Sequence, residues 1–147
     1  MPYMSINKQL KKLEDDLNSL LPNILTEAAD YLVKAPVGEA AGGSPVYSGA
    51  YVKSHSITTS SGNGRSRTST GKPSANPAAE REEARALLYG DIAGIPKDTT
   101  KVYINNRSPH AMIVENGLGR TPAYKVYTGL RVEIGNIVSR AINKTKV

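Results

Sequence analysis

Very few side chains in this sequence could do covalent or acid–base chemistry. The 147 residues include no cysteine and only two histidines, His55 and His110, neither of which has a companion at metal-binding spacing. The lack of cysteine excludes disulfides, thiolate nucleophiles, zinc fingers and iron–sulfur clusters. Glu80, Glu82 and Glu83 cluster without a histidine beside them, which is typical of a solvated helix start. We therefore expect packed or surface histidines, no metal and no cofactor.

The glycine-rich segment around Gly71 and Lys72 approaches a phosphate-binding loop without completing it. Position 66 is serine where that motif needs glycine, and Pro73 replaces the hydroxyl residue that would bind magnesium. Asp91 and Asp98 flank a link that contains Gly and Pro, and we interpret them as turn residues. A nuclease or toxin would need a convergent acid–base set, which the sequence does not offer. The sequence therefore predicts that the chain is not an enzyme.

The elements that position these residues begin with a long amphipathic helix. Apolar residues recur at spacings of three and four over residues 5–34, with Ser5 as the expected N-cap. Pro22 interrupts this run without changing its phase, so we expect a kink or a two-part helix. Four leucines are expected to lie on a sheet or on a neighbouring subunit: Leu13, Leu17, Leu20 and Leu25.

Further helices are predicted in the second half of the chain. Residues 78–89 form one, with acids in its first turns and Gly90 as its C-cap. Residues 109–116 suit one or two turns closed by Gly117. Beyond Pro122 the apolar spacing is again helical, although a strand over 124–127 before that helix is an alternative.

Two strands and a long loop complete the predicted architecture. Residues 51–60 and 100–106 have the β-branched, alternating pattern of strands. Residues 61–77 contain almost no apolar side chain, which predicts a mobile loop. The fold class is thus α+β. We expect one domain, 1–147, with a long N-terminal helix packed on a small, mostly antiparallel β-sheet, a C-terminal helix and a long mobile loop.

The net charge of +6 is concentrated in two regions. Residues 53–72 hold four basic side chains and no acid, and residues 101–147 hold eight basic and two acidic side chains. This asymmetry favours a phosphate-rich or acidic partner on one side, or a basic surface that only maintains solubility. No apolar run approaches the roughly 18 residues of a membrane-spanning helix. We expect contact with a partner protein or DNA at five basic residues: Lys53, Arg65, Arg67, Lys72 and Arg120.

Two segments, residues 35–55 with APV and VYSGAYVKSH and residues 101–117 with KVYINN and PHAMIVENG, resemble the neck or tail-completion proteins of tailed bacteriophages, a family of minor tail proteins. Residues 35–37 (APV) and 46–55 (VYSGAYVKSH) resemble the family's Pro-Val after the long helix and the turn into its first strand. Residues 101–106 (KVYINN) and 109–117 (PHAMIVENG) are similar to its strand, Asn-Asn turn and hydrophobic-Glu-x-Gly element. Residues 121–123 (TPA), before the last helix, also fit the family's order.

Five residues of these segments form its structural motif: Gly49, Asn105, Asn106, Glu115 and Gly117. The two glycines permit backbone angles that other residues avoid, at a strand entry and a helix exit. The two asparagines can hydrogen-bond their own backbone in a turn. Glu115 lies in an otherwise apolar turn and needs a donor or a basic partner if it is buried, with Lys53 and Arg120 as the obvious candidates.

The resemblance implies a structural virion protein of the head–tail junction, a neck or tail-completion ring that joins the head connector to the tail. It implies a homo-oligomer, usually a hexameric ring. The neighbours would be head-connector proteins (adaptor or stopper) and tail-terminator or tail-tube proteins, with DNA in the channel as a further contact and no membrane. Such a protein is assembled in the host cytoplasm and resides in the virion. The loop 61–77 would dock on a neighbouring subunit or face the DNA channel.

A small basic nucleic-acid-binding domain is the alternative reading. The basic segments lack interleaved aromatic residues for base stacking, apart from Tyr124 and Tyr127, and no helix-turn-helix or RNA-binding motif is present. Leu, Ile and Val together make up only about a fifth of the chain. Such a thin core is compatible with a subunit that is completed by its neighbours.

Overall fold

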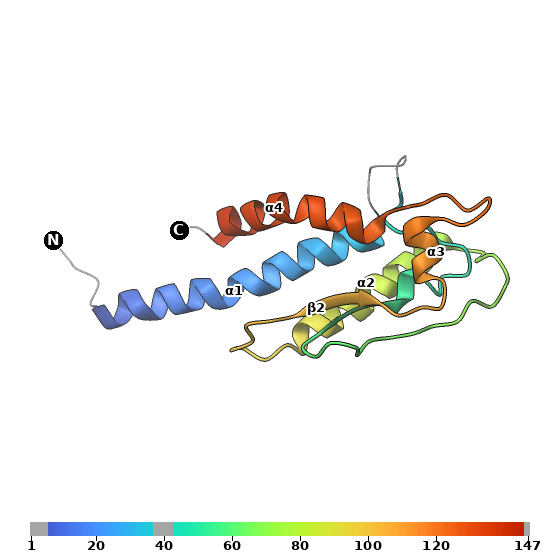
Figure 1. Ribbon diagram of the computed structural model, residues 1–147. Coiled ribbons are helices and arrows are strands. Elements are labelled where there is room, and N and C mark those ends of the chain that lie inside the picture. The colour runs from blue at the N-terminus through green and yellow to red at the C-terminus, as the bar shows by residue number, and fades with distance from the viewer. Residues whose placement is uncertain (1–5, 37–42, 146–147) are drawn as a thin grey trace.

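The computed structural model describes residues 6–36 and 43–145 as four helices, a short 3₁₀ turn and a two-stranded sheet. The first helix, α1 (Ile6–Val33), is 28 residues long and forms the long axis of the molecule (Figure 1). It continues through Pro22 as one helix, so the two-part alternative is not adopted. The expected N-cap, Ser5, lies outside the described residues, as does Val37 of the Pro-Val pair.

The sheet is small and antiparallel. Strand β1 (His55–Thr58) pairs with β2 (Tyr103–Asn106), so that His55 lies opposite Asn106 and Thr58 opposite Tyr103. Both strands are shorter than the sequence predicts. In the first, a 3₁₀ turn, Val52–Ser54, occupies the beginning of the predicted strand. The α+β class, the long N-terminal helix, the antiparallel sheet and the C-terminal helix are confirmed.

Helix α2 (Pro77–Ala93) extends one turn beyond the predicted end. Its N-cap is Asn76, whose side-chain oxygen accepts the N–H of Ala79 at 3.1 Å. The prediction that Gly90 ends the helix is wrong: Gly94 is the C-cap, and Gly90 lies within the last turns. The interpretation of Asp91 as a turn residue is also wrong, because Asp91 lies within α2.

The C-terminal part consists of two helices joined by a tight connection. Helix α3 (Ala111–Asn116) is closed by Gly117 as predicted, with a φ of 78°. Helix α4 (Val126–Thr145) begins within residues 124–127, for which a strand was the alternative prediction, and no strand forms there. The N–H of Tyr124 instead bonds the carbonyl of Val114 at 2.9 Å, which folds the connection back onto α3.

The core lies on two sides of the C-terminal half of α1. On one side Leu25, Ala29 and Val33 contact α2 and the sheet through residues such as Leu88 and Ile57. On the other side Ala28 and Leu32 contact Tyr51 and the α4 residues Val126, Leu130 and Ile137. The adjacent small residues, Ala28 and Ala29, let two helices approach α1 closely. Burial of this half accounts for the position of α1 between α2 and α4.

The segment 61–77 follows a defined path along the edge of β1. The backbone N–H of Arg65 donates to Ser56 Oγ at 2.8 Å, and that of Arg67 donates to Ser54 Oγ at 2.9 Å. Near its end, the N–H of Ser74 bonds the carbonyl of Tyr47 at 2.6 Å. Between these points residues 70–73 are exposed. Mobility of the segment stays a prediction. Because the hydrogen bonds hold residues 65–67 and 74, we expect any mobility to lie in residues 70–73.

Candidate interaction surfaces

The first candidate for chemistry, His55, is a structural residue. It is fully buried at the start of β1. The Ser44 hydroxyl donates to the carbonyl of Leu32 at 2.6 Å, so its oxygen accepts the Nε2–H of His55 at 2.7 Å. Nδ1 then accepts the Tyr127 hydroxyl at 2.7 Å. Burial, and to a smaller extent the charge of Arg65, lower the pKa of His55 to about 3. The imidazole is neutral and fixed, with no free nitrogen for acid–base work.

The other chemistry-bearing side chains are not grouped. His110 is exposed at the surface, immediately before α3. Within residues 6–36 and 43–145, no three His, Asp or Glu side chains lie close enough together to hold a metal ion. Among the helices that the structure describes, none is both long and apolar enough to cross a bilayer.

Arg65, a predicted partner contact, is bound within its own chain. Its guanidinium meets the Asp91 carboxylate with two parallel hydrogen bonds of 2.9 Å and also donates to the carbonyls of Lys53 and His55. Asp91 in turn accepts the N–H of Ile57 at 3.0 Å. The pair thus fastens the loop to β1 and α2. The guanidinium of Arg65 is therefore used within the chain.

Lys53 is also paired within the chain. Its ammonium lies 2.7 Å from Glu80 and 3.5 Å from Glu83, and Glu80 is only partly exposed. The hydrogen bond and charge of Lys53 lower the pKa of Glu80, and Glu80 raises the pKa of Lys53. A side chain at Gly49, where φ is 93°, would collide with the Glu80 carboxylate. The expectation that Glu80 is a solvated residue is therefore wrong, because Lys53 and Gly49 enclose it.

Arg67, Lys72 and Arg120 remain exposed, as a partner contact requires. Within the described part of the chain, none of the three forms an ion pair. Lys72 follows Gly71 in the sequence, and Arg120 precedes Thr121. Gly71 and Thr121 both line one surface hollow. The structure therefore places two of the five predicted basic residues beside one concave surface, and places Lys53 and Arg65 elsewhere in internal pairs.

The carboxylate of the motif residue Glu115 accepts hydrogen bonds, but not from Lys53 or Arg120, the two donors expected. Its Oε1 accepts the N–H groups of Tyr127 and Thr128, each at 2.9 Å, at the N-terminus of α4. A carboxylate there satisfies two backbone donors that the helix leaves free and opposes the positive end of its dipole. Lys53 and Arg120, the expected partners, are not involved. Gly117 belongs to the same corner, since a Cβ there would lie 2.9 Å from the carbonyl of Thr121.

The asparagines serve the strand and its exit. The Oδ1 of Asn106 accepts the N–H of Ser108 at 3.0 Å, which is the predicted turn. Its Nδ2 donates to the carbonyl of Tyr51 at 2.8 Å. Asn105 makes no bond to its own turn: its Nδ2 donates to the carbonyl of Asn63 at 2.9 Å. The turn interpretation is therefore correct for Asn106, the last residue of β2, and wrong for Asn105, whose side chain ties the loop to the strand.

The sequence does not indicate the role of one stabilising residue, Arg81. Its guanidinium donates to the carbonyls of Val33 and Lys34 at 3.1 and 3.0 Å, and to that of Ser44. It therefore satisfies carbonyls that the C-terminus of α1 leaves free. The two elements are 48 positions apart in sequence, so nothing local marks Arg81 for this role.

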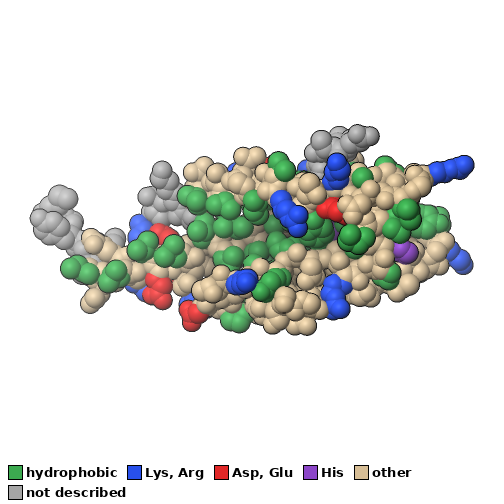
Figure 2. All heavy atoms as spheres, viewed as in Figure 1, with side chains coloured by type: hydrophobic (Ala, Val, Ile, Leu, Met, Phe, Trp, Pro, Cys, Tyr) green, Lys and Arg blue, Asp and Glu red, His purple; other side chains and the backbone are tan. Residues whose placement is uncertain are grey.

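The N-terminal half of α1 carries an apolar surface that the described residues leave exposed. Ile6, Leu10, Leu13 and Leu17 are 73, 59, 55 and 58 % exposed, and they lie on one face at spacings of four, three and four. We call these four residues the α1 stripe. Figure 1 shows that this half of α1 extends past the end of α4, and Figure 2 shows the apolar side chains along it. Of the four leucines expected on a sheet or neighbour, only Leu25 is fully in the core.

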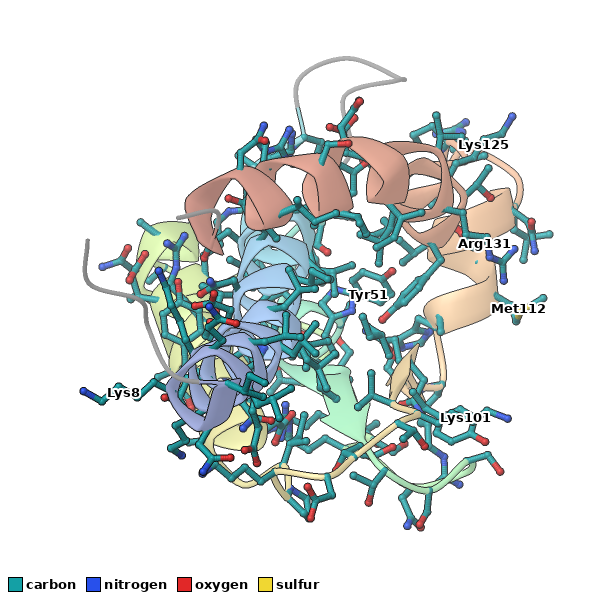
Figure 3. All side chains as sticks on the ribbon, turned by 90° about the vertical axis from the view of Figure 1, so that its left-hand side faces the viewer. Lys8, Tyr51, Lys101, Met112, Lys125 and Arg131 are labelled. Atoms are coloured by element: carbon teal, nitrogen blue, oxygen red, sulfur yellow. The ribbon has the colours of Figure 1, made fainter. Side chains whose placement is uncertain are left out.

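At the opposite end, the turn before β1, the loop 69–71 and the residues around α3 enclose a hollow of about 670 Å³. Its apolar lining is rich in tyrosine, and includes Pro45, Tyr47, Tyr51, Ile113 and Tyr124. Figure 3 shows Tyr51 directed into the interior, whereas Lys125 points outwards. We call this concavity the tyrosine hollow.

Comparison with known proteins adds no relative: the chain matches no protein-family model, no curated protein and no solved structure.

Proposed function

We propose that the chain is a structural subunit of a bacteriophage head–tail junction, a neck or tail-completion protein that works in a homo-oligomeric ring. The observation that carries this proposal is the α1 stripe. Four large apolar side chains at helical spacing are more than half exposed on a helix end that extends past the end of α4. Amphipathic helices are stabilised by burying such a face, so a helix of this kind is typical of a subunit.

The motif residues support the same proposal through their roles. Gly49, Asn106, Glu115 and Gly117 fix turns and a helix start through contacts with the backbone. Residues that only shape the backbone suit a scaffold protein. The resemblance to the phage family rests on these same segments and on the order of elements, and it supplies the identity of the assembly.

The proposal is tested first on the purified chain. We expect native mass spectrometry and light scattering to give a multiple of the 15.7 kDa monomer. Replacing Leu10, Leu13 and Leu17 together by Gln is expected to return the chain to a monomer without loss of helix content. Val132→Gln is the matched control, because Val132 is 80 % exposed on α4 and lies outside the stripe. A triple variant that assembles like the parent chain contradicts the proposal.

The phage assignment itself is tested in particles. Infection without the protein, or with the triple variant, is expected to yield heads and tails that are not joined, as seen by electron microscopy. Normal, joined and infectious particles would refute the head–tail role while leaving a different assembly open.

A nucleic-acid-binding domain is the second candidate, favoured by the exposed basic residues beside the tyrosine hollow. Filter binding over a range of salt concentrations separates the two functions. Tight binding whose logarithm falls steeply with the logarithm of salt concentration, about one unit for each neutralised phosphate, would favour this candidate. Reversing the charge of Lys72 and Arg120 would then reduce that slope by about two units.

A further inference from the structure

The two-stranded sheet has one edge that the chain itself covers and one that it leaves open. The outer edge of β1 lies beside the loop that carries Arg65, whose N–H donates to Ser56 Oγ. Strand β2 forms the opposite edge, and all four of its residues are partly exposed. Figure 1 shows β2 across the front of the molecule, with no helix or strand drawn over it. An uncovered edge offers main-chain donors and acceptors to an incoming strand.

The hydrogen bonds of β1 show which main-chain groups of β2 point outwards. Ile57 is paired with Ile104, but its N–H donates to the Asp91 carboxylate at 3.0 Å, on the side away from β2. In an antiparallel pair, residues directly opposite each other either bond to one another or both turn outwards. Ile104 therefore turns its N–H and C=O to the open edge.

A second residue of β2 faces the same way. Asn106 is paired with His55, whose carbonyl accepts a hydrogen bond from Arg65 on the outer side of β1. Within the part of the chain that the structure describes, no other segment bonds the main chain of Ile104 or Asn106 at the open edge. Outward-facing groups on alternate residues are what an added strand pairs with.

A small hollow adjoins this edge. Ile104, Tyr127, Leu130, Arg131 and Ile134 enclose about 250 Å³ between β2 and α4. This volume lies below the roughly 300–1,000 Å³ of small-molecule sites, so the hollow suits a side chain better than a cofactor. Figure 2 shows apolar side chains gathered in the middle of this face, with Lys and Arg side chains at its margins. Every second side chain of an added strand would lie on the side of the hollow.

The charges next to the open edge are positive. Lys101 and Arg107 lie just before and just after β2, and Arg131 lines the hollow. All three are exposed, and none of them forms an ion pair with another described residue. Figure 3 shows Lys101 and Arg131 on the side of the molecule where β2 lies. Three such cations favour a partner with carboxylates.

The acidic residues of the neighbouring elements are balanced locally. The carboxylate of Glu115, near the end of α3, is bound by N–H groups at the start of α4. Glu133 of α4 lies 3.4 Å from Arg140. Asp98, in the segment before β2, directly follows Lys97 in the sequence. The surroundings of the open edge therefore keep a net positive charge.

A second copy of β2 does not suit this edge. Antiparallel pairing of two copies about Ile104 would place Lys101 of each copy opposite Arg107 of the other. Like charges directly opposite each other destabilise a pair of strands. Phosphate groups of DNA suit the cations, but DNA lacks the alternating main-chain donors and acceptors that pair with Ile104 and Asn106. An acidic polypeptide in extended conformation suits both the edge and its charges.

We propose that the open edge of β2 binds an extended, acidic segment of a partner protein as a third strand. The main chain of that segment bonds Ile104 and Asn106, and one of its apolar side chains enters the hollow. Its carboxylates face Lys101, Arg107 and Arg131. Strand addition of this kind takes its affinity from main-chain bonds and its specificity from side-chain pockets. The inference goes beyond the ring proposed above and does not depend on it.

The probe for this edge is a short synthetic peptide in which glutamate and valine alternate. We expect fluorescence anisotropy to show that it binds the full chain. A peptide with the same side chains, but methylated on alternate backbone nitrogens, loses its main-chain donors and should bind at least about tenfold more weakly. Lysine in place of glutamate should abolish binding. In NMR spectra, the amide proton of Ile104 should exchange more slowly when the first peptide is bound.

Charge reversal tests the cations at the edge. Lys101→Glu with Arg107→Glu is expected to weaken binding of the glutamate peptide at least about tenfold. Lys72→Glu with Arg120→Glu is the matched control, because it makes the same change in net charge beside the tyrosine hollow and should bind like the parent chain. All four positions are exposed, so circular dichroism should show unchanged folding.

Each alternative has its own outcome. The inference fails if the glutamate peptide does not bind, if the methylated peptide binds equally well, or if the exchange of the Ile104 amide is unchanged. Binding of duplex DNA that depends on Lys101 and Arg107, without binding of the peptide, would show a nucleic-acid surface instead. A dimer that the double variant at residues 101 and 107 disrupts, again without peptide binding, would show that two β2 strands pair. The mass of the chain in solution tests the ring separately.

Discussion

The Glu115 carboxylate receives the backbone N–H of Thr128 at 2.9 Å, and thereby fixes the start of α4 to the end of α3. The same Oε1 accepts the N–H of Tyr127 at 2.9 Å. One side chain therefore sets the direction in which the C-terminal helix leaves its turn. The register of α4 against α1, and hence the length of α1 that stays uncovered, depends on that direction.

Glu115→Ala is expected to lower the free energy of unfolding by about 1 kcal/mol, and up to about 2 kcal/mol, as for the loss of other helix caps. Glu115→Gln keeps an acceptor oxygen and loses the favourable interaction with the helix dipole, so it should lie between the parent and the alanine variant. Urea unfolding followed by circular dichroism measures both changes. An unchanged midpoint for the alanine variant would show that the cap contributes nothing.

Arg65→Ala should destabilise the chain by roughly 2 kcal/mol, because it removes a bidentate bond and leaves the half-buried Asp91 with fewer donors. Arg65→Lys restores the charge but cannot make two parallel bonds, so it should recover only part of the loss. The control is Arg67→Ala, since its exposed side chain has no ion pair among the described residues. Equal urea midpoints for Arg65→Ala and Arg67→Ala would contradict the role of the Asp91 pair.

The stability of the chain should fall as the pH is lowered from about 6.5 towards 5. The folded state keeps His55 neutral down to a pKa of about 3, whereas the unfolded state binds a proton near pH 6.5. The unfolded state therefore gains protons that the folded state refuses, and the loss approaches about 1.4 kcal/mol per pH unit. Glu80, whose pKa Lys53 lowers, adds a further loss only at lower pH, near and below 4.5.

This effect is best measured in a His110→Gln background, where His55 is the only histidine. Urea unfolding at several pH values gives the slope, and the imidazole signals in NMR spectra should not titrate between pH 7 and 5. A titration midpoint near 6.5 in the folded chain would show that His55 is accessible to protons.

A broad-specificity protease should cut the native chain first within residues 70–73, which are exposed between two anchored stretches. Residues 65–67 should resist, because the backbone N–H groups of Arg65 and Arg67 bond Ser56 and Ser54, and the hydroxyl of Ser66 bonds the carbonyl of Arg107. In Arg65→Ala the cleaved region is expected to spread towards residue 65. Mass spectrometry of the first fragments decides the matter: early cuts at 65–67 in the parent chain would mean that these anchors do not hold.

The sequence by itself determined the helices and the strands. These depend on local information: apolar spacing of three and four marks α1 and α4, and the β-branched alternation marks β1 and β2. Boundaries were less accurate. Gly90 suggested the end of α2, but the helix continued to Ala93, because Leu88 is buried against α1 and Asp91 holds Arg65 and Ile57.

Only the tertiary structure decided how the polar residues of the candidate site are used. Arg65 and Asp91 are 26 positions apart, and Lys53 and Glu80 are 27 apart, so no local pattern shows that each pair meets. The stripe is a similar case. Periodicity marked Leu13, Leu17 and Leu25 as one apolar face, but α4 and α2 cover only the part of that face from about Leu21 onwards. Spacing along a helix is a local property, whereas burial depends on where distant segments end.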